Sequence, residues 1–153
     1  KDMGHEIASH SCTHINLLHA DTQRIFYEIT ESKKVLESIL KDKIEGFAYP
    51  YGMFNTEIKN IVMRYYSYAR GASFNVDPWN LSLNDTYTIG AVTPKHALKL
   101  LKSKELRKDI KLLVIYMHLE SLVEIATLIL YLKSLFFKPK FLTMNEAIRR
   151  LKI

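Results

Sequence analysis

The sequence predicts an α/β fold with a mostly parallel sheet. Short apolar runs typical of strands alternate along the 153 residues with longer runs whose apolar positions recur at helical spacing. Strands separated by helices of this length usually pair in parallel and are buried on both faces. Six strands are expected, a number that fits either an open doubly wound sheet or an incomplete barrel. No Pro-, Gly- or Ser-rich linker divides the chain, so a single domain over residues 1–153 is expected.

The first half of the chain is expected to hold three strands and two helices. The strand candidates are Glu6–Ser9, Gly46–Tyr49 and Ser67–Gly71. Asp21 or Thr22 can cap a helix that runs to about Lys43. Its apolar positions at helical spacing are Ile25, Phe26, Ile29, Leu36, Ile39 and Leu40. Asn55 can cap a second helix, Thr56 to about Tyr65.

The second half is expected to alternate in the same way. Its strand candidates are Tyr87–Val92, Ile110–Met117 and Pro139–Leu142. Thr93 followed by Pro94 is typical of a helix start, here of a helix that runs to about Lys104. A further helix is expected from about Ser121 to Phe136, and Thr143–Glu146 has the spacing of a capping box that opens the last helix.

Composition excludes several classes of protein. Hydrophobic residues make up 48% of the chain, with 5 Gly and 4 Pro, which excludes collagen and wholesale disorder. The longest apolar stretches, Leu112–Met117 and Ile125–Leu132, are far shorter than the roughly 20 residues that span a bilayer, so no transmembrane segment is expected. Cys12 is the single cysteine, which excludes an internal disulfide. No secretory signal is visible, but residue 1 is Lys, so location is not predicted.

The chain is basic, with 22 Lys and Arg against 16 Asp and Glu and a formal charge of +6. A basic balance can indicate a nucleic-acid partner. The positive residues are scattered, with short clusters at Lys102–Lys111 and Arg149–Lys152 and no stripe interleaved with aromatic residues. We therefore expect solvated helix faces and no nucleic acid, and keep a basic nucleic-acid-associated domain as a distant alternative.

Three polar clusters each follow the end of a predicted strand. They are His10–His14, Tyr49–Gly52 and His118. Because the carboxyl ends of parallel strands share one edge of a sheet, we expect these clusters to lie together and to form a site.

His10 and His14 have the spacing of a metal-binding pair. On one turn of helix or in a tight loop, both imidazoles face the same side and can bind one ion, for which zinc, iron, cobalt or nickel would suit. Two ligands are too few for a catalytic site, so a third, a carboxylate, is expected. The alternative is that both rings are surface or helix-capping groups. Cys12 is expected to be a small packing residue, and His5, His19 and His96 to have no role in the site.

Four segments together resemble the polysaccharide deacetylase family, also known as the NodB-homology domain or carbohydrate esterase family four. Gly4–His14 reads GHEIASHSCTH and is similar to the metal-binding segment of that family. Phe47–Gly52, FAYPYG, is similar to the family segment that follows. Leu113–His118 resembles the late strand that carries a general-acid histidine, and Phe141–Glu146 resembles the closing strand and helix.

The resemblance implies a distorted (β/α) barrel and hydrolysis of N-acetyl groups from an amino-sugar polymer, such as a chitin-like or peptidoglycan glycan. It implies a divalent metal held by one aspartate and two histidines, here His10 and His14. Zinc is the expected metal, with cobalt, nickel or iron as alternatives. The resemblance makes His118 the general acid and the backbone N–H of Tyr51 an oxyanion donor, with Pro50, Tyr51 and Trp79 in contact with substrate. The alternatives are that His118 is a structural histidine with a satisfied ring and that Trp79 lies in the core. It also suggests a cell-surface or secreted location.

Two departures from the family pattern shape the prediction. The family's acidic segment, which supplies the base and the metal aspartate, precedes the two histidines, and nothing from Lys1 onward matches it; Asp2 lies before the wrong strand. Ala48 stands where many members carry an arginine that orients the base. We therefore expect a barrel without its first strand, with two exposed sheet edges, that is marginally stable or forms a homo-oligomer. The leading alternative is a catalytically inactive carbohydrate-binding relative.

Overall fold

The computed structural model describes residues 4–72, 76–78, 80, 84–103, 108, 110–118, 122–134 and 140–151. Within these ranges the helices are α1 (Thr22–Leu40), α2 (Thr56–Tyr65), α3 (Pro94–Lys102), α5 (Leu122–Ser134) and α6 (Met144–Leu151). The strands are β1 (Gly46–Ala48), β2 (Tyr68–Arg70), β3 (Ala91–Val92) and β4 (Val114–Ile115), and two short 3-10 turns are η1 (Leu17–His19) and η2 (Pro50–Gly52).

All the strand pairings in the described residues are parallel, as the sequence predicts. β1 pairs with β2, and β3 pairs with β4. Two isolated bridges extend this order, because Ser9 pairs with Phe47 in β1 and Arg70 in β2 pairs with Ile89, just before β3. Neighbouring strands therefore follow the order of the sequence, and the predicted α/β class is confirmed.

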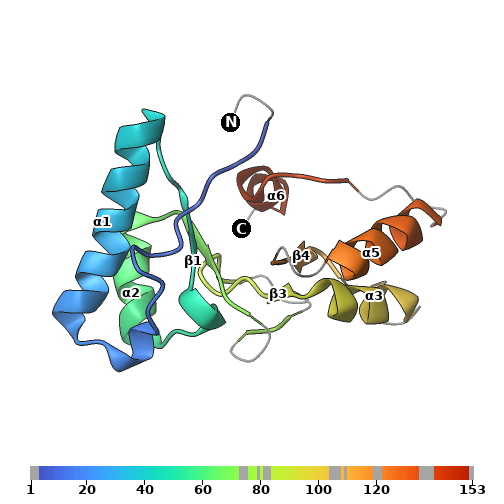
Figure 1. Ribbon diagram of the computed structural model, residues 1–153, viewed down its shortest axis with the longest axis horizontal. Coiled ribbons are helices and arrows are strands. Elements are labelled where there is room, and N and C mark those ends of the chain that lie inside the picture. The colour runs from blue at the N-terminus through green and yellow to red at the C-terminus, as the bar shows by residue number, and fades with distance from the viewer. Residues whose placement is uncertain are drawn as a thin grey trace.

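Two hydrophobic clusters support this sheet. The larger lies between α1, α2 and the β1–β2 pair, and α1 and α2 run side by side on this part of the molecule (Figure 1). Its fully buried members include Leu17, Ile29, Ile44, Phe47, Tyr49, Ile58 and Val62. The smaller packs α3 and α5 against the β3–β4 pair through Val92, Ala97, Leu101 and Leu128. The larger cluster is the one that positions the histidine segment.

The helix starts are confirmed at the predicted caps. Side-chain oxygens of Asp21, Asn55, Thr93 and Thr143 each accept the N–H of the residue three positions later. The first helix ends at Leu40 rather than near Lys43, because Lys41 takes a left-handed conformation with φ 51°.

The apolar stripe predicted for α1 is only partly correct. Phe26 and Ile39 are 47% and 70% exposed, so they lie outside the core. The buried face instead runs through Ile25, Glu28, Ile29 and Ser32. A carboxylate therefore occupies the core side of this helix, and its partners are described with the site below.

Asn80 explains why β3 and β4 are shorter than predicted. The expected strand Tyr87–Val92 contains three paired residues, Ile89, Ala91 and Val92, and the expected strand Ile110–Met117 contains two. The buried Asn80 amide donates to the carbonyl oxygens of Gly90 (2.9 Å) and Leu112 (3.1 Å) and accepts from the Gly90 N–H (2.7 Å). These bonds occupy backbone groups that a longer ladder would use.

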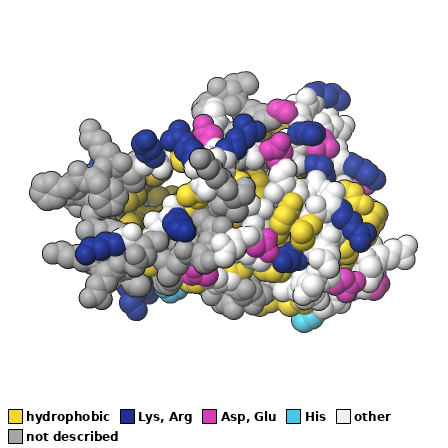
Figure 2. Space-filling model, turned by 180° about the vertical axis from the view of Figure 1, so that it is seen from behind, with side chains coloured by type: hydrophobic (Ala, Val, Ile, Leu, Met, Phe, Trp, Pro, Cys, Tyr) yellow, Lys and Arg dark blue, Asp and Glu magenta, His cyan; other side chains and the backbone are white. Residues whose placement is uncertain are grey.

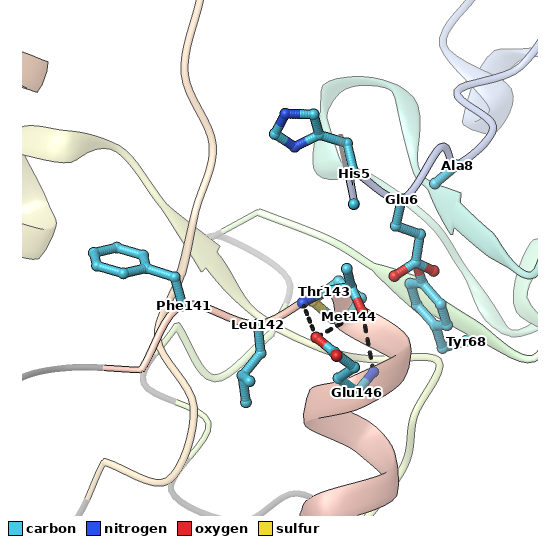
Figure 3. Close-up of a pocket in the computed structure, with 10 residues that line it drawn as sticks. His5, Glu6, Ala8, Tyr68, Phe141, Leu142, Thr143, Met144 and Glu146 are labelled. Atoms are coloured by element: carbon cyan, nitrogen blue, oxygen red, sulfur yellow. Dashed lines mark hydrogen bonds between the residues drawn. The ribbon is translucent and has the colours of Figure 1, made fainter. Parts of the chain in front are cut away.

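Glu6 connects the first segment of the chain to the last helix. Its carboxylate accepts the Tyr68 hydroxyl (2.6 Å) and the backbone N–H of Asn145 in the first turn of α6 (3.0 Å). Figure 3 shows Glu6 and Tyr68 beside the start of that helix. An acidic side chain at a helix N-terminus is favoured by the helix dipole, so this contact also stabilises α6.

The surface shows no segregation of charge on the face seen in Figure 2. Lys and Arg side chains are dispersed there and alternate with Asp and Glu. Across the described residues, no helix combines the length and the apolarity needed to cross a bilayer.

Candidate active site

The structure places the predicted clusters at one edge of the sheet. His10 follows the bridge residue Ser9, the Pro50–Gly52 turn follows β1, and His118 lies three residues after β4. Because the pairings are parallel, these positions share the carboxyl edge of the sheet. Trp79, the remaining predicted site residue, lies outside the described residues.

His10 and His14 are in direct contact. Their ring centroids are 4.7 Å apart and the ring planes are inclined by 72°. His10 Nδ1 lies 2.7 Å from the Ala48 carbonyl oxygen, so Nδ1 carries the proton and donates. The other ring nitrogen, Nε2, is left with its lone pair. A histidine whose second nitrogen is fixed by a backbone carbonyl is the usual arrangement of a metal ligand.

The pKa of His10 is lowered from its ordinary value. Burial is the main cause, and the positive charges of Arg70, His14 and His118 act in the same direction, against the hydrogen bond to Ala48. His10 is therefore neutral at neutral pH, which is the form that binds a metal.

The two histidines sit in a tight loop, one of the two conformations that the spacing left open. Ser11 (φ 67°) and His14 (φ 54°) are both left-handed, an uncommon conformation for residues with a side chain. The Ser11 hydroxyl accepts the His14 N–H (3.0 Å). Cys12 is exposed in this loop, so the prediction that it packs in the core is wrong.

Glu28 holds this loop against α1, and the sequence analysis missed it. The fully buried carboxylate accepts the backbone N–H groups of Cys12 (2.9 Å) and Thr13 (2.8 Å) and the Thr13 hydroxyl (2.5 Å). Arg24 pairs with its other face (2.7 Å). Burial alone would raise the pKa of Glu28, but these hydrogen bonds and the Arg24 charge outweigh it and lower the pKa. The signal in the sequence was an acidic residue beside Ile25 and Ile29 in the core stripe.

Replacing Glu28 by Ala is expected to lower the free energy of unfolding by about 1.5–3 kcal/mol, the range for hydrogen bonds to a charged group. The Arg24 pair adds little, because Arg24 is 44% exposed and solvent screens it. Urea denaturation measures this loss. Because the folded-state pKa is lowered, the charge of Glu28 stabilises the fold above the ordinary value of 4.5 and stops doing so as pH falls through the folded value.

The matched control for Glu28 is Glu31→Gln on the same helix. Glu31 pairs with Lys34 at 3.4 Å on the exposed side. The Glu31→Gln variant should have the same free energy of unfolding as the wild type. The Glu28→Gln variant should be less stable than the wild type at pH 7, and the difference should shrink in acid. Equal stability of the two Gln variants at pH 7 would contradict the role given to Glu28.

The Pro50–Gly52 turn brings Tyr51 to the histidines. The Tyr51 ring lies 4.7 Å from the His14 ring, and Tyr51 itself is left-handed (φ 56°, ψ 8°). The turn is closed by the Gly52 N–H, which donates to the Tyr49 carbonyl oxygen (2.9 Å). Pro50 is buried while Tyr51 is 53% exposed, so the tyrosine faces the open side of the rim.

Gly52→Ala is expected to damage this turn. Gly52 has φ 69°, and an added Cβ would lie 2.5 Å from the Ala72 backbone nitrogen. The conformation costs a residue with a side chain about 1–2 kcal/mol, and overpacking adds about 1–3 kcal/mol. Gly4→Ala is the control, because Gly4 also has a positive φ (79°) but open space around it. Thermal melts that show equal losses for both variants would contradict the close contact with Ala72.

His118 is exposed and lies apart from the ring cluster. Its ring centroid is 6.1 Å from that of Tyr116. Its charge is close enough to lower the pKa of His10, which places it on the same rim.

The donor set fits part of a metal site. The two imidazoles lie together, and the tautomer of His10 is fixed. Among the described residues, however, no three His, Cys, Asp or Glu side chains lie close enough together to hold a metal ion. A catalytic zinc site normally has three protein ligands. His10 and His14 can therefore supply two of them, and the third ligand remains a prediction.

A separate cavity of about 460 Å³ lies at the other edge of the sheet. It is lined by the segment before Ser9, by Tyr68 and by residues 141–146, with His5 on its wall (Figure 3). The strand predicted over Pro139–Leu142 is not formed in its described part, 140–142. The cavity lies between that part and the segment before Ser9, and it contains none of the predicted site residues.

Comparison with known proteins agrees with the predicted resemblance. Residues 1–68 match the polysaccharide deacetylase family model. A chitooligosaccharide deacetylase from Azorhizobium caulinodans is 34% identical over 76 residues, which cover 49% of this chain and 35% of that protein. The chain thus spans about a third of the length of that relative.

Solved structures share the fold along nearly the whole chain. The carbohydrate-esterase domain of a xylanase from the hindgut metagenome of Trinervitermes trinervoides has a TM-score of 0.59 at 20% identity and covers 99% of this chain and 67% of that one. A deacetylase solved with substrate has a TM-score of 0.61 at 16% identity, over 97% and 67%. A pseudoenzyme of carbohydrate esterase family four from Bacillus anthracis reaches 0.58 at 16% identity, over 96% and 47%. The match over residues 1–68 and these shared folds confirm the resemblance to the polysaccharide deacetylase family.

Proposed function

We propose that this chain forms the active-site region of a metal-dependent hydrolase that removes N-acetyl groups from an amino-sugar polymer. The single observation that carries the proposal is the cluster of His10, His14 and Tyr51 rings, in which the Ala48 carbonyl fixes the His10 tautomer. The match of residues 1–68 to the family model supports the reaction class, and the chitooligosaccharide deacetylase relative supports a glycan substrate. The barrel form of the sheet is part of the same proposal.

The histidine pair would hold a divalent metal, zinc first and cobalt, nickel or iron as alternatives. Such an ion, when bound, lowers the pKa of a coordinated water and polarises the acetyl carbonyl. His10 would use Nε2, because Nδ1 is committed to Ala48. A carboxylate that completes the ligand set and a carboxylate base are required in addition.

The remaining roles fall to the rim. The backbone N–H of Tyr51 would donate to the oxyanion that forms as water adds to the acetyl carbon. His118, when protonated, would donate its proton to the amine nitrogen as the C–N bond breaks, which leaves acetate and a free amine. The exposed ring of Tyr51, together with Trp79, would contact the sugar. Pro50, which is buried, would shape the turn rather than touch the substrate.

The test is acetate release from an acetylated chitooligosaccharide by the full-length protein, loaded with zinc or cobalt and compared with an EDTA-treated sample. Acetate and free amine should appear in equal amounts and only with metal. Binding of the oligosaccharide without acetate release, in metal-loaded protein, would overturn the hydrolase proposal and indicate a carbohydrate-binding relative.

A further inference from the structure

Arg70 is a charged residue of the rim to which the functional account above gives no role. It ends β2 and lies directly opposite Ala48 of β1 in the parallel register. Its guanidinium carbon lies 5.6 Å from the centre of the Tyr116 ring, and that ring contacts His118. Arg70 therefore spans the space between the histidine pair and the residues that follow β4.

The part of the chain that the structure describes supplies no carboxylate to balance the positive charge of Arg70. Its side chain is half-buried, and burial lowers the pKa of the guanidinium. No carboxylate of the described residues forms an ion pair with it. Arg70 and His10 lie close enough for their charges to interact, and His14 and His118 also act on His10, so this rim gathers positive charge when the histidines are protonated. The Glu28 carboxylate is committed to the histidine loop.

Such a guanidinium is suited to bind an anion. A half-buried charge with no counter-ion gains much more from an ion pair than a solvated surface charge does. The planar fork of arginine matches a carboxylate, which it binds through two parallel N–H···O bonds. The guanidinium lies over the Tyr116 ring, a cation–π contact that uses none of its N–H donors for a hydrogen bond.

We propose that Arg70 binds a carboxylate at the histidine rim. This inference rests on the proposed function for the identity of the ligand. The carboxylate is either the acetate formed by deacetylation or an acidic side chain of the protein that completes the site. In both cases the positive charge that binds the carboxylate comes from Arg70 at the end of β2, the residue that pairs with Ala48 of β1.

The first test measures acetate binding to the metal-free 153-residue chain. The binding is monitored by NMR during a titration with ¹³C-acetate. Arg70→Gln should weaken acetate binding roughly tenfold or more, since a charge-assisted hydrogen-bonded pair is lost. Arg70→Lys keeps the positive charge but loses the planar fork of N–H donors. Its acetate affinity should lie between those of the wild type and Arg70→Gln. The control is Arg64→Gln, which makes the same charge change on the exposed side of α2 and should bind like wild type.

The second test distinguishes the two sources of the carboxylate in the metal-loaded, full-length protein. If acetate is the ligand, Arg70→Gln should raise the inhibition constant of acetate. If an acidic side chain is the ligand, the variant should lower kcat and shift the acid limb of the pH profile upward, with acetate inhibition unchanged. The proposal would be overturned if Arg70→Gln left acetate affinity unchanged and also left the pH profile of deacetylation unchanged. It would also be overturned if acetate affinity were unchanged and the protein had no deacetylase activity. Arg70-dependent acetate binding in a protein without deacetylase activity would overturn the proposed function alone.

Discussion

Replacing either His10 or His14 by Ala should abolish retention of a divalent metal. Loss of an outer-shell partner already costs roughly 10–100-fold in metal affinity, and loss of a direct ligand from a pair costs more. The rings are 4.7 Å apart in a loop whose conformation is fixed by Ser11 and Glu28, so neither can be replaced by a neighbour. Metal content after dialysis, and calorimetric titration with zinc, measure the effect.

His96→Ala is the matched control for the histidine pair. His96 is exposed on α3, where its Nδ1 lies 3.0 Å from the Thr93 hydroxyl, away from the loop. This variant should retain metal like wild type. Equal metal retention in all three variants would remove the assignment of the metal site.

Replacing His118 by Ala should lower the rate of acetate release by roughly 10²–10⁴-fold, the usual contribution of general acid–base catalysis. The loss should fall on kcat, because protonation of the leaving nitrogen belongs to the chemical step. The ring is exposed at the rim and contacts the Tyr116 ring. Metal retention and the free energy of unfolding should stay near the wild-type values, which separates this effect from that of the His10 and His14 variants.

The choice of leaving group sharpens the test of His118. An amide nitrogen must be protonated as it departs, whereas a nitrophenolate leaves without a proton. Hydrolysis of 4-nitrophenyl acetate should therefore be nearly unaffected in His118→Ala while deacetylation of the oligosaccharide falls. A parallel loss on both substrates would contradict the assignment of His118 as general acid.

Much of the fold follows from local signals in the sequence. Caps such as Asp21 and Asn55 fix helix starts through their own neighbours, and they occur where predicted. Strand lengths depend instead on distant partners. The Asn80 side chain, far from Leu112 in sequence, donates to the Leu112 carbonyl oxygen and so occupies a group that a longer β4 would use. The apolar pattern of Ile110–Met117 does not indicate this contact.

The site divides in the same way. The positions of His10, His14 and Tyr51 could be predicted because each follows a strand and parallel strands share an edge. Glu28 could not be assigned in advance, since its partners Cys12 and Thr13 lie 16 and 15 residues earlier, in the loop before α1. Arg70 was missed because its surroundings arise only when β2 pairs with β1 and residue 116 approaches from β4.

The carboxylate of Glu6 also has a consequence for the order of folding. Its bond to Asn145 joins positions 139 residues apart, so closing it costs chain entropy that no local contact offsets. The histidine loop and α1 can form early from near neighbours, while α6 must await this late closure. Amide exchange should accordingly find the last helix opening well before the larger core, with the histidine loop still closed.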